Sequence, residues 1–270
     1  MADHDTGDGR PEEPTRPSGW TEHTPTATGA VDISVAYANP PTDELMALYA
    51  AWAESYDSDL IDAYGYMAPA DAVAAFTRLG LHPDAAILDA GCGTGQAGAL
   101  LAAAGYTSVD GADLSPEMRD VAARLGVYRN LYHLDMTADY APQIADAIGG
   151  ATGSDRATLP DAALDDPPLH DAPLYDAPLY DAPLYDAIIC VGVFGYGPPH
   201  IGDLPRIMDA AAAGAPVLVT VNGMGWVKMG WEDGLPPVLS AAGIELRSRT
   251  RIRHMVNEGI EAELLELRRG

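Results

Sequence analysis

The chain has 270 residues, of which 47% are hydrophobic and 20% charged, so it can bury a sizeable core and is not disordered throughout. Forty acidic against fifteen basic residues give a net charge of −25, which disfavours nucleic-acid partners because phosphate recognition depends on lysine and arginine. No apolar run approaches the roughly 18 to 20 residues that span a bilayer, and the N-terminus does not resemble a secretory signal. We therefore expect a cytoplasmic protein without a membrane partner.

Aspartate dominates the acidic residues, with 28 aspartates against 12 glutamates, and Lys228 is the sole lysine. A densely acidic, lysine-poor composition resembles that of cytoplasmic proteins from halophiles that accumulate salt. A GC-rich genome, which favours alanine, glycine, aspartate and arginine codons, is the alternative source of this bias. We predict a halophilic protein.

The first part of the chain divides into a tail and two helices. Residues 1–41 are rich in proline, threonine and acids and lack apolar periodicity, which predicts a disordered tail ahead of one domain over residues 42–270. Apolar side chains at helical spacing predict a helix over residues 43–60, with Asp43 as its cap. A second helix is expected over residues 70–79.

Strands and helices then alternate with short connections. The expected strands cover residues 85–90, 108–113, 130–135, 185–191 and 216–221, and the expected helices cover residues 96–104, 116–125 and 204–213. This alternation predicts a parallel sheet with helices on both faces, and Ser115 is expected to cap the middle helix. Residues 244–254 and 259–267 flank a turn and predict a closing hairpin that ends the sheet with an antiparallel edge.

One connection is unusually long, because about fifty residues separate the third and fourth strands. It contains the pentapeptide DAPLY three times in tandem, over residues 171–185, and many aspartates and prolines. This composition predicts a solvated low-complexity insertion over about residues 138–184. The alternative is a substrate lid formed by the repeated tyrosines, Tyr175, Tyr180 and Tyr185.

A glycine-rich turn connects the first strand to the following helix. Small residues from Asp89 to Gly95 let the backbone approach a ligand near a helix N-terminus, which indicates a nucleotide-type site. Gln96 stands where a dinucleotide fingerprint has glycine, and Asp89 would repel a pyrophosphate. An acid at this place suits a cationic group such as the amino group of a methionine moiety.

The segment ILDAGCGTG, over residues 87–95, resembles the first motif of the class I S-adenosylmethionine-dependent methyltransferases. The resemblance implies that Asp113, at the second strand end, binds the ribose hydroxyls and that Asp135, at the third, contacts the adenine amino group. It also implies a Rossmann-like α/β fold, with a seven-stranded, mostly parallel sheet, an antiparallel last strand, and S-adenosyl-L-methionine as cofactor. The cofactor-binding residues it indicates are Tyr56, Tyr66, Asp89, Gly91, Cys92, Gly93, Gly95, Asp113, Leu114, Asp135, Met136 and Val191.

Residues 52–69, WAESYDSDLIDAYGYMAP, resemble more narrowly the methyltransferase-like subfamily named after the Williams–Beuren region. This resemblance implies that Tyr56 and Tyr66 cover the methionine end of the cofactor. The alternative is that both are core aromatics.

The expected reaction is methyl transfer to a small-molecule acceptor, in which the protein mainly positions the nucleophile. His200 is a candidate base, with Tyr196 a weaker one, although the favoured interpretation of His200 is a loop residue that caps the following helix. Cys92 and Cys190 lack metal-ligand spacing, so no metal site is expected. The rival functions are a cofactor-binding protein that has lost catalysis and acts through a partner, and a nicotinamide oxidoreductase, which Gln96 and Asp89 disfavour.

Four arginines alternate along one predicted strand, at positions 247, 249, 251 and 253. Their period of two places them on one face of the strand, where an anionic substrate or partner can dock. The favoured interpretation is that they pair with surrounding carboxylates and protect the sheet edge.

Overall fold

The computed structural model describes residues 41–139, 143, 185–195 and 197–269. The predicted tail lies outside these residues except for Pro41. Most of the predicted insertion, with its first two DAPLY copies and all but the last residue of the third, also lies outside them, as does Tyr196.

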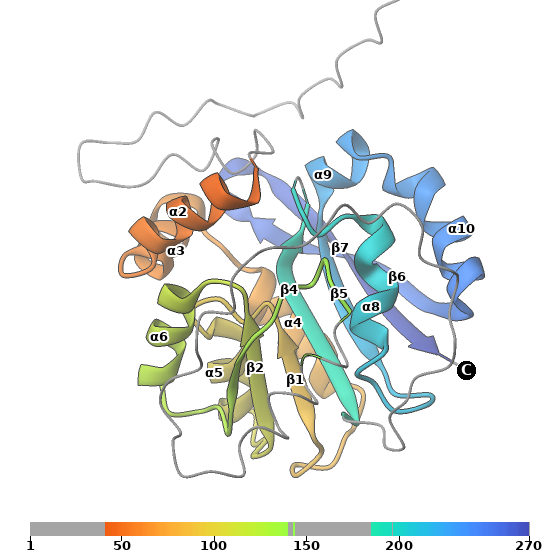
Figure 1. The fold of residues 1–270 in the computed structure, drawn as a ribbon, viewed down its shortest axis with the longest axis horizontal. Helices are drawn as coiled ribbons and strands as arrows, with labels where there is room; N and C mark the ends of the chain where they lie inside the picture. Colours follow the sequence, from red (N-terminus) through yellow and green to blue (C-terminus); the bar gives the residue numbers. More distant parts are fainter. Residues whose placement is uncertain (1–40, 140–142, 144–184, 196, 270) are drawn as a thin grey trace, which may run out of the picture.

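Seven strands form one sheet in the order β3-β2-β1-β4-β5-β7-β6 (Figure 1). The strands are β1 (Ile87–Ala90), β2 (Val109–Asp113), β3 (Leu131–His133), β4 (Ala187–Phe194), β5 (Val217–Asn222), β6 (Ile244–Met255) and β7 (Ile260–Arg269). Strands β1 to β5 pair in parallel, while β7 is antiparallel to both of its neighbours. The expected seven-stranded, mostly parallel sheet is confirmed. The reversed strand is not the edge, because β7 pairs with β5 and leaves β6 outermost.

Helices cover both faces of this sheet. On one face, α4 (Ala68–Thr77) and α5 (Gln96–Ala103) bury Phe76 and Leu101 against strand residues such as Ile189. On the other face lie η2 (Ile201–Asp203), α8 (Leu204–Met208), α9 (Gly223–Lys228) and α10 (Trp231–Ala242). Helix α6 (Pro116–Arg124) packs against β2 and β3, and the Ser115 hydroxyl accepts from the Met118 N–H at 3.2 Å, as predicted for its cap. None of the helices in the described ranges is long and apolar enough to cross a membrane.

The N-terminal segment forms two helices, α2 (Thr42–Trp52) and α3 (Tyr56–Tyr64), where the sequence predicts one. The Asp59 carboxylate accepts from the Trp52 indole and the Ser55 hydroxyl, both at 2.8 Å, and these bonds hold the corner between the helices. Asp43 lies in the first turn of α2 and is not its cap. Trp52, Leu60 and Tyr64 pack against Met255 and Ile260, which lie on either side of the short turn η3 (Val256–Glu258). The two helices therefore lie over the carboxyl ends of the strands.

Candidate functional site

A cavity of about 220 Å³ opens at the carboxyl ends of the strands, beneath α2 and α3. The sheet order reverses between β1 and β4, and such switch points are where open α/β sheets bind ligands. The glycine turn, the ends of β2, β3 and β4, and the two roof helices all contribute to its lining.

The glycine turn requires glycine at its first position. Gly91 has φ +72°, and a Cβ there would lie 2.2 Å from a methyl carbon of Val193. The N–H groups of Gly91 and Cys92 donate to the Ala112 carbonyl at 2.7 and 2.9 Å, which ties the turn to β2. The backbone of the turn therefore forms the cavity wall directly.

Asp89 is the last residue but one of β1, and its carboxyl is buried, 1% exposed. One oxygen, Oδ2, accepts from the Tyr128 hydroxyl at 2.6 Å, while Oδ1 has no hydrogen-bond partner among the described residues. Burial raises the pKa of Asp89 to about 7, against the lowering effect of the Tyr128 hydrogen bond. Gly98 makes room for this partner, because a Cβ there would lie 2.2 Å from the Tyr128 ring.

Asp113 ends β2 and is held by backbone donors. Its Oδ2 accepts from the Gly93 N–H at 2.8 Å and its Oδ1 from the Ser115 N–H at 2.9 Å. Burial raises the pKa of Asp113, and these N–H donors oppose the shift. The bonds fix the carboxylate at the cavity wall next to Leu114, with lone pairs left for a ligand.

Asp135 lies beyond β3, where its Oδ1 accepts from the N–H and hydroxyl of Thr137 at 2.8 and 2.7 Å. Its neighbour Met136 is buried and also lines the cavity. The three predicted acids, Asp89, Asp113 and Asp135, are thus brought to one cavity.

The roof of the cavity is aromatic. Tyr56 packs edge-on against Trp52, with ring centroids 4.7 Å apart, and against Tyr49 at 6.2 Å. Asp57, on the same helix, accepts from the Gln96 amide at 2.7 Å and from the Thr94 hydroxyl. This carboxylate joins the roof to the glycine turn.

Tyr66 follows α3 and reaches β4, where a Cβ on Gly192 would lie 2.3 Å from its hydroxyl oxygen. Its ring packs edge-on against buried His254, with centroids 5.2 Å apart, and the His254 Nε2 lies 3.0 Å from the Asn222 amide nitrogen. Tyr66, Asn222 and His254 all line the cavity.

Of the predicted site residues that the structure describes, two lie outside this lining. His200 is exposed, and its N–H donates to Asp203 at 2.8 Å at the start of η2, which matches the alternative of a helix-capping residue. Gly95 has φ +96° and precedes α5, where a Cβ would lie 2.7 Å from Leu125. The other predicted cofactor residues, including Val191, line the cavity.

Sequence reasoning missed Tyr128, Asn222, His254 and Tyr49. Tyr128 reaches Asp89 across 39 positions of the sequence and His254 reaches Asn222 across 32, and no local motif marks any of the four.

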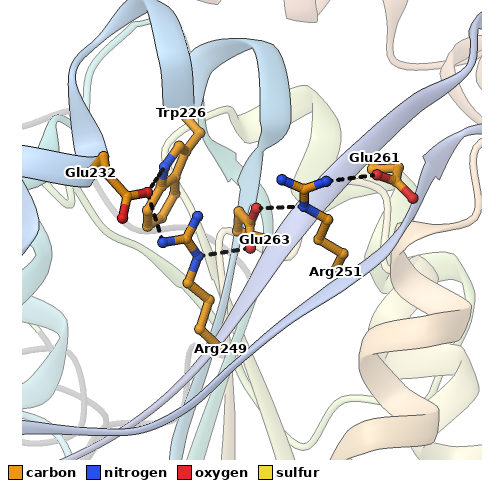
Figure 2. A network of polar contacts seen from close by, with 6 residues as sticks. All are labelled: Trp226, Glu232, Arg249, Arg251, Glu261 and Glu263. Carbon is orange, nitrogen blue, oxygen red and sulfur yellow. Dashed lines mark hydrogen bonds and ion pairs between the residues drawn. The ribbon is translucent and has the colours of Figure 1, made fainter.

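The alternating arginines pair with carboxylates, as the favoured interpretation predicts. Figure 2 shows Arg249 between Glu232 and buried Glu263, with N–O distances of 2.8 and 2.9 Å, and Arg251 between Glu263 and Glu261. The Arg249 guanidinium also lies 4.0 Å from the Trp226 ring centre. The other two arginines of the set pair with Glu245 and Asp71.

Comparisons with known proteins agree with this architecture. Residues 62–257 match the family model described as a methyltransferase domain. Human methyltransferase-like protein 27 is 36% identical over 101 residues, which cover 37% of this chain and 41% of the human protein, so the chain spans less than half the length of this relative.

Two solved structures share the fold at low sequence identity. The TehB-like SAM-dependent methyltransferase from Corynebacterium glutamicum aligns with a TM-score of 0.50 and 22% identity, covering 83% of this chain and 99% of that one. The 1,6-didemethyltoxoflavin-N1-methyltransferase from Burkholderia thailandensis aligns with a TM-score of 0.50 and 17% identity, covering 85% and 90%.

Proposed function

Because this chain belongs to the methyltransferase domain family, we propose that its cavity binds S-adenosyl-L-methionine and that it transfers the methyl group to a small-molecule acceptor. The observation that carries the proposal is the meeting of three acids from successive strand ends around one glycine turn. The cofactor supplies the activated methyl group, so the protein's task is binding and alignment.

The residues fit this cofactor in two respects. The buried Asp89 Oδ1 has no partner within the described part of the chain, and an ammonium group is the ligand that best offsets a buried carboxylate. Gly93 lines the cavity and nothing lies within 4 Å of the place its Cβ would take, so a ligand can come close to the backbone there.

The remaining assignments follow the strand ends. Asp113 accepts the two ribose hydroxyls, Asp135 accepts from the adenine amino group, and Tyr56 and Tyr66 cover the methionine end. The match to human methyltransferase-like protein 27 supports the narrower methyltransferase-like subfamily assignment. The small-molecule acceptor is supported by the toxoflavin compound named for the Burkholderia structure.

The test is calorimetric titration of S-adenosyl-L-methionine into the native chain and Asp113→Ala. Loss of charge-assisted bonds to two hydroxyls should weaken binding by roughly 1.5 to 3 kcal/mol. Asp120→Ala is the matched control, because Asp120 is exposed on neighbouring α6 and does not line the cavity. Equal affinities for the two variants would remove Asp113 from the ribose site, and absence of binding to the native chain would refute the proposed cofactor.

A further inference from the structure

The two ends of the cavity differ in charge. The ionisable acids of its described lining, Asp89, Asp113 and Asp135, stand at the ends of β1 to β3. Beyond β4 the described wall contains Tyr66, Phe194 and Met255, together with the polar but uncharged Asn222 and His254. Since the proposed cofactor occupies the acidic end, the uncharged end is left for the methyl acceptor.

The hydrogen bonds of Asn222 determine the state of His254. Asn222 Oδ1 accepts from the N–H groups of Met224 and Gly225 at 2.9 and 3.3 Å, so its amide nitrogen is the group that faces His254 Nε2 at 3.0 Å. An amide nitrogen only donates, and Nε2 must therefore be the acceptor. The ring proton of the neutral histidine is on Nδ1.

His254 is neutral because it is buried, 4% exposed, and burial lowers its pKa to about 4. With Nε2 occupied by the amide and Nδ1 already protonated, this side chain does not take a proton from a substrate. Tyr49 also keeps its proton at neutral pH, because burial raises its pKa to about 12, and burial raises the pKa of Tyr66 as well. Because none of these groups removes a proton from a substrate, a nucleophile bound beside them must already have a free lone pair.

A nitrogen acceptor meets this condition, whereas a hydroxyl acceptor is a weak nucleophile until it loses its proton. Methylation of a neutral ring nitrogen also creates a cation, which the aromatic side chains of this end, Tyr66 and Phe194, can stabilise. The same rings suit a flat aromatic molecule.

We propose that the uncharged end of the cavity binds a neutral aromatic compound and that the methyl group is transferred to a nitrogen of that compound; this rests on the proposed function. The nitrogen lone pair forms the new N–C bond while the C–S bond of the sulfonium breaks. The bonding electrons of the C–S bond stay on sulfur, which becomes a neutral thioether, and the positive charge moves to nitrogen. A ring nitrogen without hydrogen needs no proton transfer.

In the test, the full chain and S-adenosyl-L-methionine are incubated with each of three acceptor probes of similar shape: isoquinoline, 2-naphthol and 2-naphthoate. Mass spectrometry should detect N-methylisoquinolinium, formed at least about ten-fold faster than either oxygen-methylated product. On the S-adenosylhomocysteine complex, isoquinoline should bind at least about ten-fold more tightly than 2-naphthoate, because a carboxylate loses hydration in an uncharged wall. Equal or tighter 2-naphthoate binding, faster oxygen methylation, or no isoquinoline product from a chain that binds the cofactor would overturn the inference.

A second measurement examines His254 itself. Nitrogen NMR of the native chain should show the neutral Nδ1–H form at pH 7. Asn222→Asp should shift the proton to Nε2, since a carboxylate can still accept from Met224 and Gly225 but cannot donate to the ring. The Nε2–H form in the native chain would overturn the inference, whereas failure to bind S-adenosyl-L-methionine at all would refute the proposed function instead.

Discussion

At the scale of single residues, Asp89 shows how a buried carboxyl in the cavity wall reduces the stability of the fold that carries it. Its pKa rises from 3.8 to about 7 on burial, so the folded state holds a proton that the unfolded chain releases. A carboxyl whose pKa is higher in the folded state lowers the free energy of unfolding as the pH rises from the unfolded-state pKa to the folded-state pKa. The loss is complete above the folded-state pKa. Asp89 therefore destabilises the ligand-free protein most above about pH 7.

Asp89→Asn removes this effect. Its free energy of unfolding should exceed that of the native chain by on the order of 1 kcal/mol or more near pH 8. The gain should be much smaller near pH 4, where the folded carboxyl is protonated and the unfolded one is about half protonated. Urea unfolding at the two pH values measures the difference, and calorimetry should show weaker S-adenosyl-L-methionine binding. A gain of equal size at both pH values would mean that packing, and not ionisation, separates the two proteins.

At the scale of elements, the roof helices depend on Asp57. This residue of α3 accepts from Gln96 and Thr94 at the glycine turn, while α2 and α3 contribute Tyr49 and Tyr56 to the cavity. Asp57→Ala should loosen the roof and speed release of S-adenosylhomocysteine roughly ten-fold, the equivalent of one to two hydrogen bonds. Stopped-flow fluorescence measures the rate. Asp62→Ala, an exposed position on the same helix, should release the product at the native rate, and equal acceleration in both variants would contradict a specific contact.

The elements also show how far sequence reasoning reaches. Residues 96–104 and 116–125 carry local signals, a glycine turn and a Ser-Pro start, and the observed helices α5 and α6 end within one residue of those bounds. Helix α10 carries opposing local signals, because Pro236 and Pro237 lie inside it, and no helix is predicted there. Its stability comes from tertiary contacts such as the edge-to-face packing of Trp231 on Phe194, with ring centroids 5.5 Å apart. Contacts of this kind between distant residues are not encoded in local periodicity.

The candidate site also has a part that the sequence predicts and a part that it does not. The three acids follow strand ends that hydrophobic runs mark, so their convergence is predictable from the order of elements. The partners that set their chemistry come from elsewhere: Tyr128 reaches Asp89 from the loop after α6, and His254 reaches the cavity from the edge strand β6. These contacts depend on the packing of the whole sheet, which no single segment of the sequence specifies.

At the scale of the whole molecule, negative charge is the dominant feature. The net charge of −25 remains after every arginine and the one lysine are counted, and arginines of β6 are already engaged by neighbouring carboxylates. Like charges on one compact body repel, and salt screens the repulsion over about 30 Å at 0.01 M but about 3 Å at 1 M. Low salt should therefore destabilise the fold.

The origin of the acidic composition determines how far this effect continues. If the composition reflects a salt-rich cytoplasm, the melting temperature should keep rising into molar KCl, beyond the few tenths molar at which ordinary screening becomes nearly complete. Codon bias predicts an early plateau instead. Thermal melts from about 0.1 M to about 3 M KCl separate the two, and a parallel series with saturating S-adenosyl-L-methionine accounts for stabilisation by ligand binding. A melting temperature that stays constant over this range would rule out the halophilic interpretation while leaving the cavity and its three acids unaffected, because their convergence is set by strand order and not by the surface charge.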